Sequence, residues 1–174
     1  VLWRNPLSYI SSRFHSFGNK WRVYNYKVDL YKGFEELSSF AQKHEDSICQ
    51  VRYESLVADP KNELARIFSF LEMEYDSTIV DKFPSVELHG RLGDKTGTKE
   101  YSSVVDSAVE KWKTTLCNPL RVWWCKKYIN WLGSSRLRII GYDYRELLEN
   151  LDSQPMGFKC LASDIPRYLY GVMD

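Results

Sequence analysis

The chain has 174 residues, of which 44% are hydrophobic, 27% charged and 15% aromatic, and 24 Lys and Arg balance 23 Asp and Glu. This length suits a single domain that buries roughly 70% of its unfolded surface, and the high aromatic content excludes low-complexity disorder. A net charge of +1 gives no global field that would attract nucleic acid or a membrane surface, so any anion site must be local.

The apolar runs are too short to span a membrane and no signal peptide is recognisable, which favours a cytoplasmic location. The four cysteines lack C-x-x-C spacing, and only three histidines accompany them. We therefore expect reduced thiols and no metal site.

The first predicted elements are a strand and a helix that meet at Arg4. Residues 1–3 are typical of the end of a buried strand, and Asn5 and Pro6 are a typical cap and first helical residue. We expect this helix to end near residue 17, before a Gly-Asn pair.

Apolar residues from Trp21 to Ala41 recur every three or four positions and predict one long amphipathic helix. A short strand over residues 48–53 follows, and Asp59 and Pro60 then open another helix. The expected buried face of that helix consists of Ile67, Phe68 and Leu71.

Further helices are expected over residues 78–83, 107–116, 118–133 and 144–151, and a glycine-containing loop over residues 87–103. Two strands that are each followed by a helix opening on Pro predict a helix-rich α/β fold with a short parallel sheet. In such sheets ligands bind at the carboxyl ends of the strands.

Three stretches carry residues suited to an anion or a nucleotide. Arg4 precedes a helix start rich in serine (Ser8, Ser11 and Ser12), and guanidinium, helix amides and hydroxyls all bind phosphate. Tyr53, at the end of the second strand, could stack on a base or sugar. The alternatives stay open: Arg4 could pair with a carboxylate, the serines could face solvent, and Tyr53 could belong to the core.

The loop carries Arg91, Lys95 and Lys99 between glycines, but it lacks a Walker A ending, and a solvated loop is the alternative reading. No catalytic residue is assigned, because the histidines are isolated; His15 on the first helix is the one that could face a cleft. Four tryptophans are expected in the core: Trp112, Trp123, Trp124 and Trp131.

Together, "RNPLSYISS" and "VRYESLVADPKNELARIFSFLEME" resemble the sulfotransferase superfamily that uses 3′-phosphoadenosine-5′-phosphosulfate (PAPS). In that family an Arg-Asp/Asn-Pro strand end and a serine eight positions later bind the 3′-phosphate, which implies this role for Arg4 and Ser12. The matching tyrosine, Tyr53, contacts the adenine side. A basic loop similar to "GDKTGTKE" closes over the nucleotide, which implies contacts by Lys95, Thr96, Gly97 and Lys99.

The resemblance extends over residues 1–143, including a family-like "GYD" at its end. It implies a partial P-loop-like three-layer fold, with a sulfotransferase-like domain over residues 1–152 and a tail of unassigned structure over 153–174. The family's 5′-phosphosulfate loop precedes the arginine motif and has no counterpart here. We therefore expect the C-terminal portion of a sulfotransferase, inactive as this span alone.

The implied activity is transfer of a sulfuryl group from PAPS to a hydroxyl or amine, with a carbohydrate as the acceptor, no metal and no nucleic-acid partner. Two alternatives remain: a catalytically inactive nucleotide-binding fragment and a helical protein-interaction module. Affinity for adenosine 3′,5′-bisphosphate separates the module from the other two.

Overall fold

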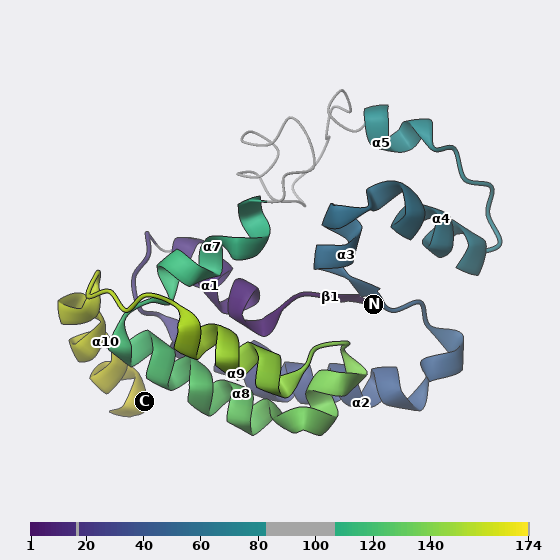
Figure 1. Cartoon of the computed structure of the whole chain (residues 1–174). Helices are drawn as coiled ribbons and strands as arrows, with labels where there is room; N and C mark the ends of the chain where they lie inside the picture. Colours follow the sequence, from purple (N-terminus) through teal and green to yellow (C-terminus); the bar gives the residue numbers. More distant parts are fainter. Residues whose placement is uncertain (17, 83–106, 174) are drawn as a thin grey trace.

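The computed structural model describes residues 1–16, 18–82 and 107–173, and shows a helix-rich chain around a short parallel sheet (Figure 1). The predicted α/β class is confirmed. The strands are β1 (Leu2–Trp3) and β2 (Val51–Arg52). The helices are α1 (Pro6–Ser16), α2 (Phe34–Lys43), α3 (Tyr53–Ala58), α4 (Pro60–Phe70), α5 (Thr78–Lys82), α7 (Ser107–Thr115), α8 (Pro119–Ile139), α9 (Tyr144–Ser153) and α10 (Leu161–Met173).

The two strands pair in parallel, with Leu2 opposite Val51 and Trp3 opposite Arg52. The backbone amide of Val51 donates to the carbonyl of Val1 over 2.9 Å, which extends the ladder by one residue. Each strand leads within two residues into a helix, so the carboxyl ends of both strands and the starts of α1 and α3 lie together. β2 is shorter than the expected strand over residues 48–53, because helix α3 already begins at Tyr53.

Predicted helix starts are confirmed where a side chain caps the helix. The carboxylate of Asp59 accepts from the amide of Asn62 at the start of α4, and Asn118 accepts from the amide of Arg121 at the start of α8. Both caps satisfy amide groups that have no partner within the helix. Such interactions depend on a few neighbouring residues only, which is why the sequence reveals them.

The single long helix expected from Trp21 to Ala41 is wrong. The chain instead forms a 3₁₀ turn (Val23–Tyr26), a π-helical segment (Val28–Gly33) and then α2. Val28, expected on the buried stripe, is 70% exposed, whereas Leu30 is buried and its carbonyl accepts from the Tyr128 hydroxyl over 2.8 Å. Packing against α8 therefore decides which residues face inward, and the regular period does not.

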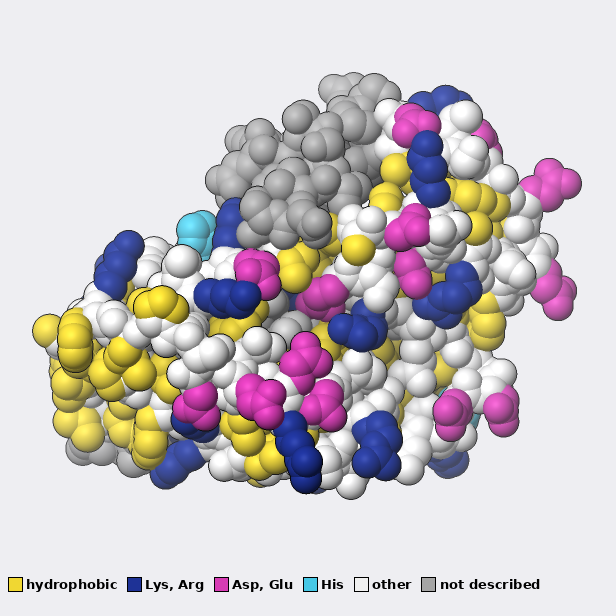
Figure 2. All heavy atoms as spheres, in the orientation of Figure 1, with side chains coloured by type: hydrophobic (Ala, Val, Ile, Leu, Met, Phe, Trp, Pro, Cys, Tyr) yellow, Lys and Arg dark blue, Asp and Glu magenta, His cyan; other side chains and the backbone are white. Residues whose placement is uncertain are grey.

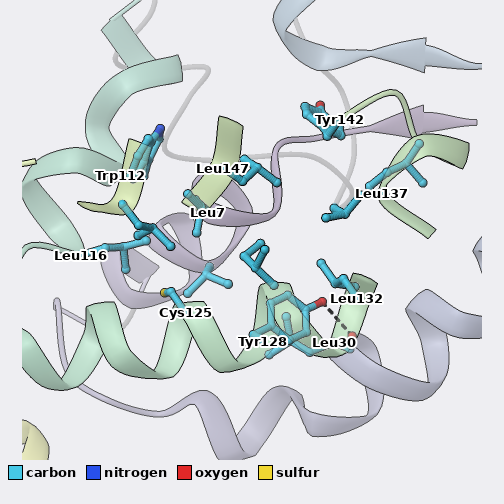
Figure 3. Packing of buried hydrophobic residues seen from close by; sticks show 14 of the residues in the cluster. Leu7, Leu30, Trp112, Leu116, Cys125, Tyr128, Leu132, Leu137, Tyr142 and Leu147 are labelled. Atoms are coloured by element: carbon cyan, nitrogen blue, oxygen red, sulfur yellow. Dashed lines mark hydrogen bonds between the residues drawn. The ribbon is translucent and has the colours of Figure 1, made fainter. Parts of the chain in front are cut away.

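The main core lies between α1, α8, α9 and the segment that precedes α2 (Figure 3). Leu7, Leu116, Ile129 and Leu137 are fully buried there. The tryptophan prediction is confirmed in part: Trp112 is buried, Trp124 and Trp131 are half-buried against the core, and Trp123 is 40% exposed. The four cysteines are free thiols.

The expected buried face of α4 is wrong. None of the residues of α4 is buried; Ile67 and Phe68 are half-buried, and Leu71 just after the helix is 54% exposed. α4 contacts α3 rather than the core beneath α1 and α8. An amphipathic pattern shows that a helix has an apolar face, but the tertiary structure decides how far that face is covered.

The helix expected to end at Gly133 is interrupted there, and then continues. Gly133 has φ 67° and ψ 166°, and helical backbone resumes up to Ile139. Beyond Gln154, where no element was assigned, the chain forms α10, which packs on α8. Over the described ranges, no helix is both long and apolar enough to cross a bilayer.

Candidate functional site

The parallel register places Arg4 and Tyr53 side by side, since each is the first residue after its strand. The guanidinium carbon of Arg4 lies 4.6 Å from the centre of the Tyr53 ring, a cation–π contact. Two residues that are 49 positions apart in the sequence thus form one surface at the carboxyl end of the sheet. This is the position where α/β proteins bind ligands.

The described residues offer Arg4 no carboxylate partner. Its Nε atom is buried without a hydrogen-bond partner, and the side chain makes no ion pair with a described residue. A buried donor without a partner costs free energy unless a ligand or water satisfies it. Among the described residues, Arg4 therefore keeps a positive charge and an unsatisfied Nε donor at the strand end.

The carboxylate of Glu54, next to Tyr53, is occupied elsewhere. One oxygen accepts from the backbone amide of Asn5 over 2.9 Å, and the other accepts from the hydroxyl of Tyr142. Asn5 itself accepts from the amide of Leu7 over 2.9 Å, as expected of a helix cap. Glu54 thus holds the start of α1 and the segment after α8 against β2, and it does not neutralise Arg4.

Burial, and then the hydrogen bond to the Glu54 carboxylate, raise the pKa of Tyr142 well above its ordinary value. Tyr142 therefore stays a neutral donor to Glu54. The Arg52 guanidinium lies 4.6 Å from the centre of the Tyr142 ring, which makes a second arginine–tyrosine stack beside the first. Arg4 and Arg52 each bring a positive charge to the carboxyl end of the sheet, and these charges favour an anion there.

Gly141 allows this second stack to form. Its φ is +80°, and a Cβ at this position would lie 3.1 Å from Cδ of Arg52. A larger residue would be strained in this backbone conformation and would press on the Arg52 side chain.

The serines of α1 divide into bound and available hydroxyls. Ser8 is buried, and its hydroxyl donates to the carbonyl of Val109 in α7 over 3.0 Å; Ser11 is buried too. These two residues contribute to packing. The expectation that Ser8 binds an anion is wrong, because its hydroxyl already donates within the protein. Ser12 is half-buried, and its hydroxyl forms no hydrogen bond with another described residue.

Ser12 lies on α1 roughly 9 Å along the helix axis from Pro6, by the 1.5 Å rise per residue. No hydrogen bond joins its side chain to that of Arg4. The other expected nucleotide contacts lie outside the described residues: Lys95, Thr96, Gly97 and Lys99. His15 is exposed near the end of α1.

Sequence reasoning missed three members of this cluster: Arg52, Glu54 and Tyr142. Glu54 belongs to the first turn of α3. The "GYD" stretch was the only signal for Tyr142, and nothing local predicts that its hydroxyl reaches a carboxylate 88 positions away. The signal for Arg52 was its position in the sequence, directly before Tyr53 at the end of the expected strand.

The model of the Sulfotransferase family matches residues 1–77. This match covers less than half of the chain, and it includes β1, α1, β2, α3 and α4 with Arg4, Ser12 and Tyr53. Residues 1–77 are therefore similar to the sulfotransferase family. Neither a curated protein nor a solved structure matches the chain significantly.

Proposed function

We propose that the chain forms the 3′-phosphate-binding part of a sulfotransferase whose donor is PAPS. The observation that carries the proposal is the Arg4 side chain, which stacks on Tyr53 at the carboxyl end of the parallel sheet, has a buried Nε without a hydrogen-bond partner and forms no ion pair with a described residue. The family match over residues 1–77 supports the reaction class. We also propose that the complete enzyme has a P-loop-like three-layer fold.

In this proposal Arg4 and Ser12 bind the 3′-phosphate. Arginine binds phosphate through two parallel hydrogen bonds, and the buried Nε without a partner fits that demand for an acceptor. Tyr53 lies beside the adenine, and Arg4 covers one face of its ring. Glu54 and Tyr142 keep α1 and β2 in register, so that the phosphate-binding groups stay aligned.

In the complete enzyme an acceptor hydroxyl or amine would attack the sulfur, and the bond from sulfur to the 5′-phosphate oxygen would break. Adenosine 3′,5′-bisphosphate leaves and the acceptor loses its proton. As in phosphoryl transfer, positioning and charge neutralisation would provide most of the catalysis. The residues named above anchor the nucleotide and do not touch the migrating group. A carbohydrate as the acceptor rests on the breadth of the family.

The test measures binding of adenosine 3′,5′-bisphosphate to the chain by calorimetry. Arg4→Ala should weaken binding by about 10- to 100-fold, because a charge-assisted hydrogen bond is worth about 1.5–3 kcal/mol. Arg136→Ala is a matched control, since Arg136 also stacks on an aromatic ring (Trp131, 4.9 Å) but pairs with Glu35. It should leave the affinity unchanged.

Adenosine 5′-monophosphate, which lacks the 3′-phosphate, should bind wild type and Arg4→Ala equally. Undiminished affinity of Arg4→Ala for the bisphosphate would refute the assignment of Arg4. Absence of bisphosphate binding by the wild type would support the protein-interaction alternative instead. A sulfuryl-transfer assay then separates an active sulfotransferase from a nucleotide-binding protein without turnover.

A further inference from the structure

An exposed apolar surface surrounds α10, far from the candidate site. We define this α10 surface by six side chains with exposed fractions between 40% and 72%: Trp123, Met156, Phe158, Ile165, Leu169 and Tyr170. Figure 2 shows hydrophobic side chains gathered over α10, at the opposite end of the molecule from α3, α4 and α5. Contiguous apolar patches of this kind mark interaction sites, whereas single exposed apolar residues need no explanation.

The α10 surface rests on a rigid base, so its exposure is not the result of a detached helix. Asp164 of α10 forms a buried ion pair with Arg121 of α8, with Nε 2.7 Å from Oδ2. The ring of Tyr168 lies 5.7 Å from the rings of both Trp21 and Trp123. One side of α10 is thus fixed to the core, and the opposite side faces outward with Ile165 and Leu169.

The charges beside this surface are positive. Over residues 154–171 the one carboxylate is Asp164, and Arg121 neutralises it in the interior. Lys159 is exposed, and Nζ of Lys127 lies 4.1 Å from the centre of the Trp123 ring at the margin of the surface. At the carboxyl end of α10, Nζ of Lys27 donates to the carbonyl of Gly171 over 3.0 Å.

We propose that the α10 surface docks onto a membrane that contains anionic phospholipids. Aliphatic side chains combined with Trp, Tyr and a margin of lysines suit the bilayer interface, where the rings lie at headgroup depth. Lys127 and Lys159 are exposed and complement the negative headgroups, whereas the nearby Asp152 carboxylate already pairs with Lys126. The surface lies on residues outside the family match, and the proposal is independent of nucleotide binding.

The test is co-sedimentation of the whole chain with phosphatidylcholine vesicles, with and without phosphatidylserine. Leu169→Glu should lower the partition coefficient for the anionic vesicles by about tenfold or more. The substitution removes an apolar group that the bilayer would bury and adds a negative charge that the anionic headgroups repel. Leu71→Glu is the matched control, since Leu71 is 54% exposed and Leu169 is 55% exposed. It should bind as the wild type does.

Lys159→Glu should weaken binding by about fivefold or more and should not affect the weak binding to neutral vesicles. Circular dichroism checks that each variant is folded, as expected for exposed positions. Failure of the wild type to bind anionic vesicles would overturn the proposal, as would equal losses in Leu169→Glu and Leu71→Glu. A dimer that Leu169→Glu abolishes, without vesicle binding, would assign the surface to a second copy and overturn it too.

Discussion

The buried pair of Arg121 and Asp164 should stabilise the fold more than any exposed ion pair of the described residues. The side chains are 1% and 0% exposed. All five N–H groups of the Arg121 guanidinium have partners: both carboxylate oxygens of Asp164, the carbonyl of Thr115, and the side-chain and backbone oxygens of Asn19. The guanidinium carbon also lies 4.2 Å from the centre of the Phe14 ring.

Asp164→Asn keeps the shape of the side chain but removes its charge. The new NH₂ group would face another donor, either the Arg121 guanidinium or the Asn118 amide, which in the wild type donates to Asp164 over 2.9 Å. The guanidinium stays buried without a counter-charge, and breaking such a pair costs about 3–5 kcal/mol. For a chain of this size the loss corresponds to roughly 6–20 °C in Tm.

Urea unfolding followed by tryptophan fluorescence and by circular dichroism measures the free energy of unfolding. The control is Asp152→Asn, whose partner Lys126 is exposed; it should lose no more than about 1 kcal/mol. In a double-mutant cycle, Arg121→Met combined with Asp164→Asn should lose less than the sum of the two single changes. Equal small losses for Asp164→Asn and Asp152→Asn would refute the reasoning.

Two further predictions concern alkaline pH and a glycine. Burial raises the pKa of Tyr142 and Tyr128. Their contribution to the free energy of unfolding is therefore complete below a pH of about 10 and is lost as the pH rises through the raised pKa values. Absorbance at 295 nm should show that these two tyrosines ionise later than the others, and a single early titration of all tyrosines in the folded protein would contradict this. Gly18 has a φ of +62° and open space around it, so Gly18→Ala should lower the free energy of unfolding by about 1–2 kcal/mol. Gly141→Ala should lower it more, because the new Cβ would contact the Arg52 side chain. A smaller drop in Tm for Gly141→Ala than for Gly18→Ala would show that this close approach is absent.

Much of the candidate site could be predicted from the sequence, because its first parts are local. Asn5 caps α1, and Arg4 precedes that cap at the end of a strand, as expected. A strand followed within two residues by a helix leaves the residue between them at the sheet's carboxyl end. The type of element and the place of the proposed anion site thus follow from a few adjacent side chains.

The partners within the site could not be predicted in the same way. The stack of Arg4 on Tyr53 depends on the register of two strands, and the bond from Tyr142 to Glu54 depends on where α8 ends in space. For the serines, the sequence places Ser8 and Ser12 on one face of α1. Only the neighbouring α7 decides that Ser8 is bound to the carbonyl of Val109.

The sequence by itself determined the helix caps, the strand-to-helix units and the positions of Arg4 and Tyr53 at strand ends, because these depend on contacts within one turn. The tertiary structure alone decided which apolar residues are buried. Leu30 is buried, whereas Val28 and Leu71 are exposed, although all three belong to segments with a similar apolar pattern. Burial depends on which distant helix packs against a given face. Asp164 is fully buried for the same reason, although it lies in a segment without a predicted element. Arg121, 43 positions away in the sequence, is buried beside it and neutralises its charge.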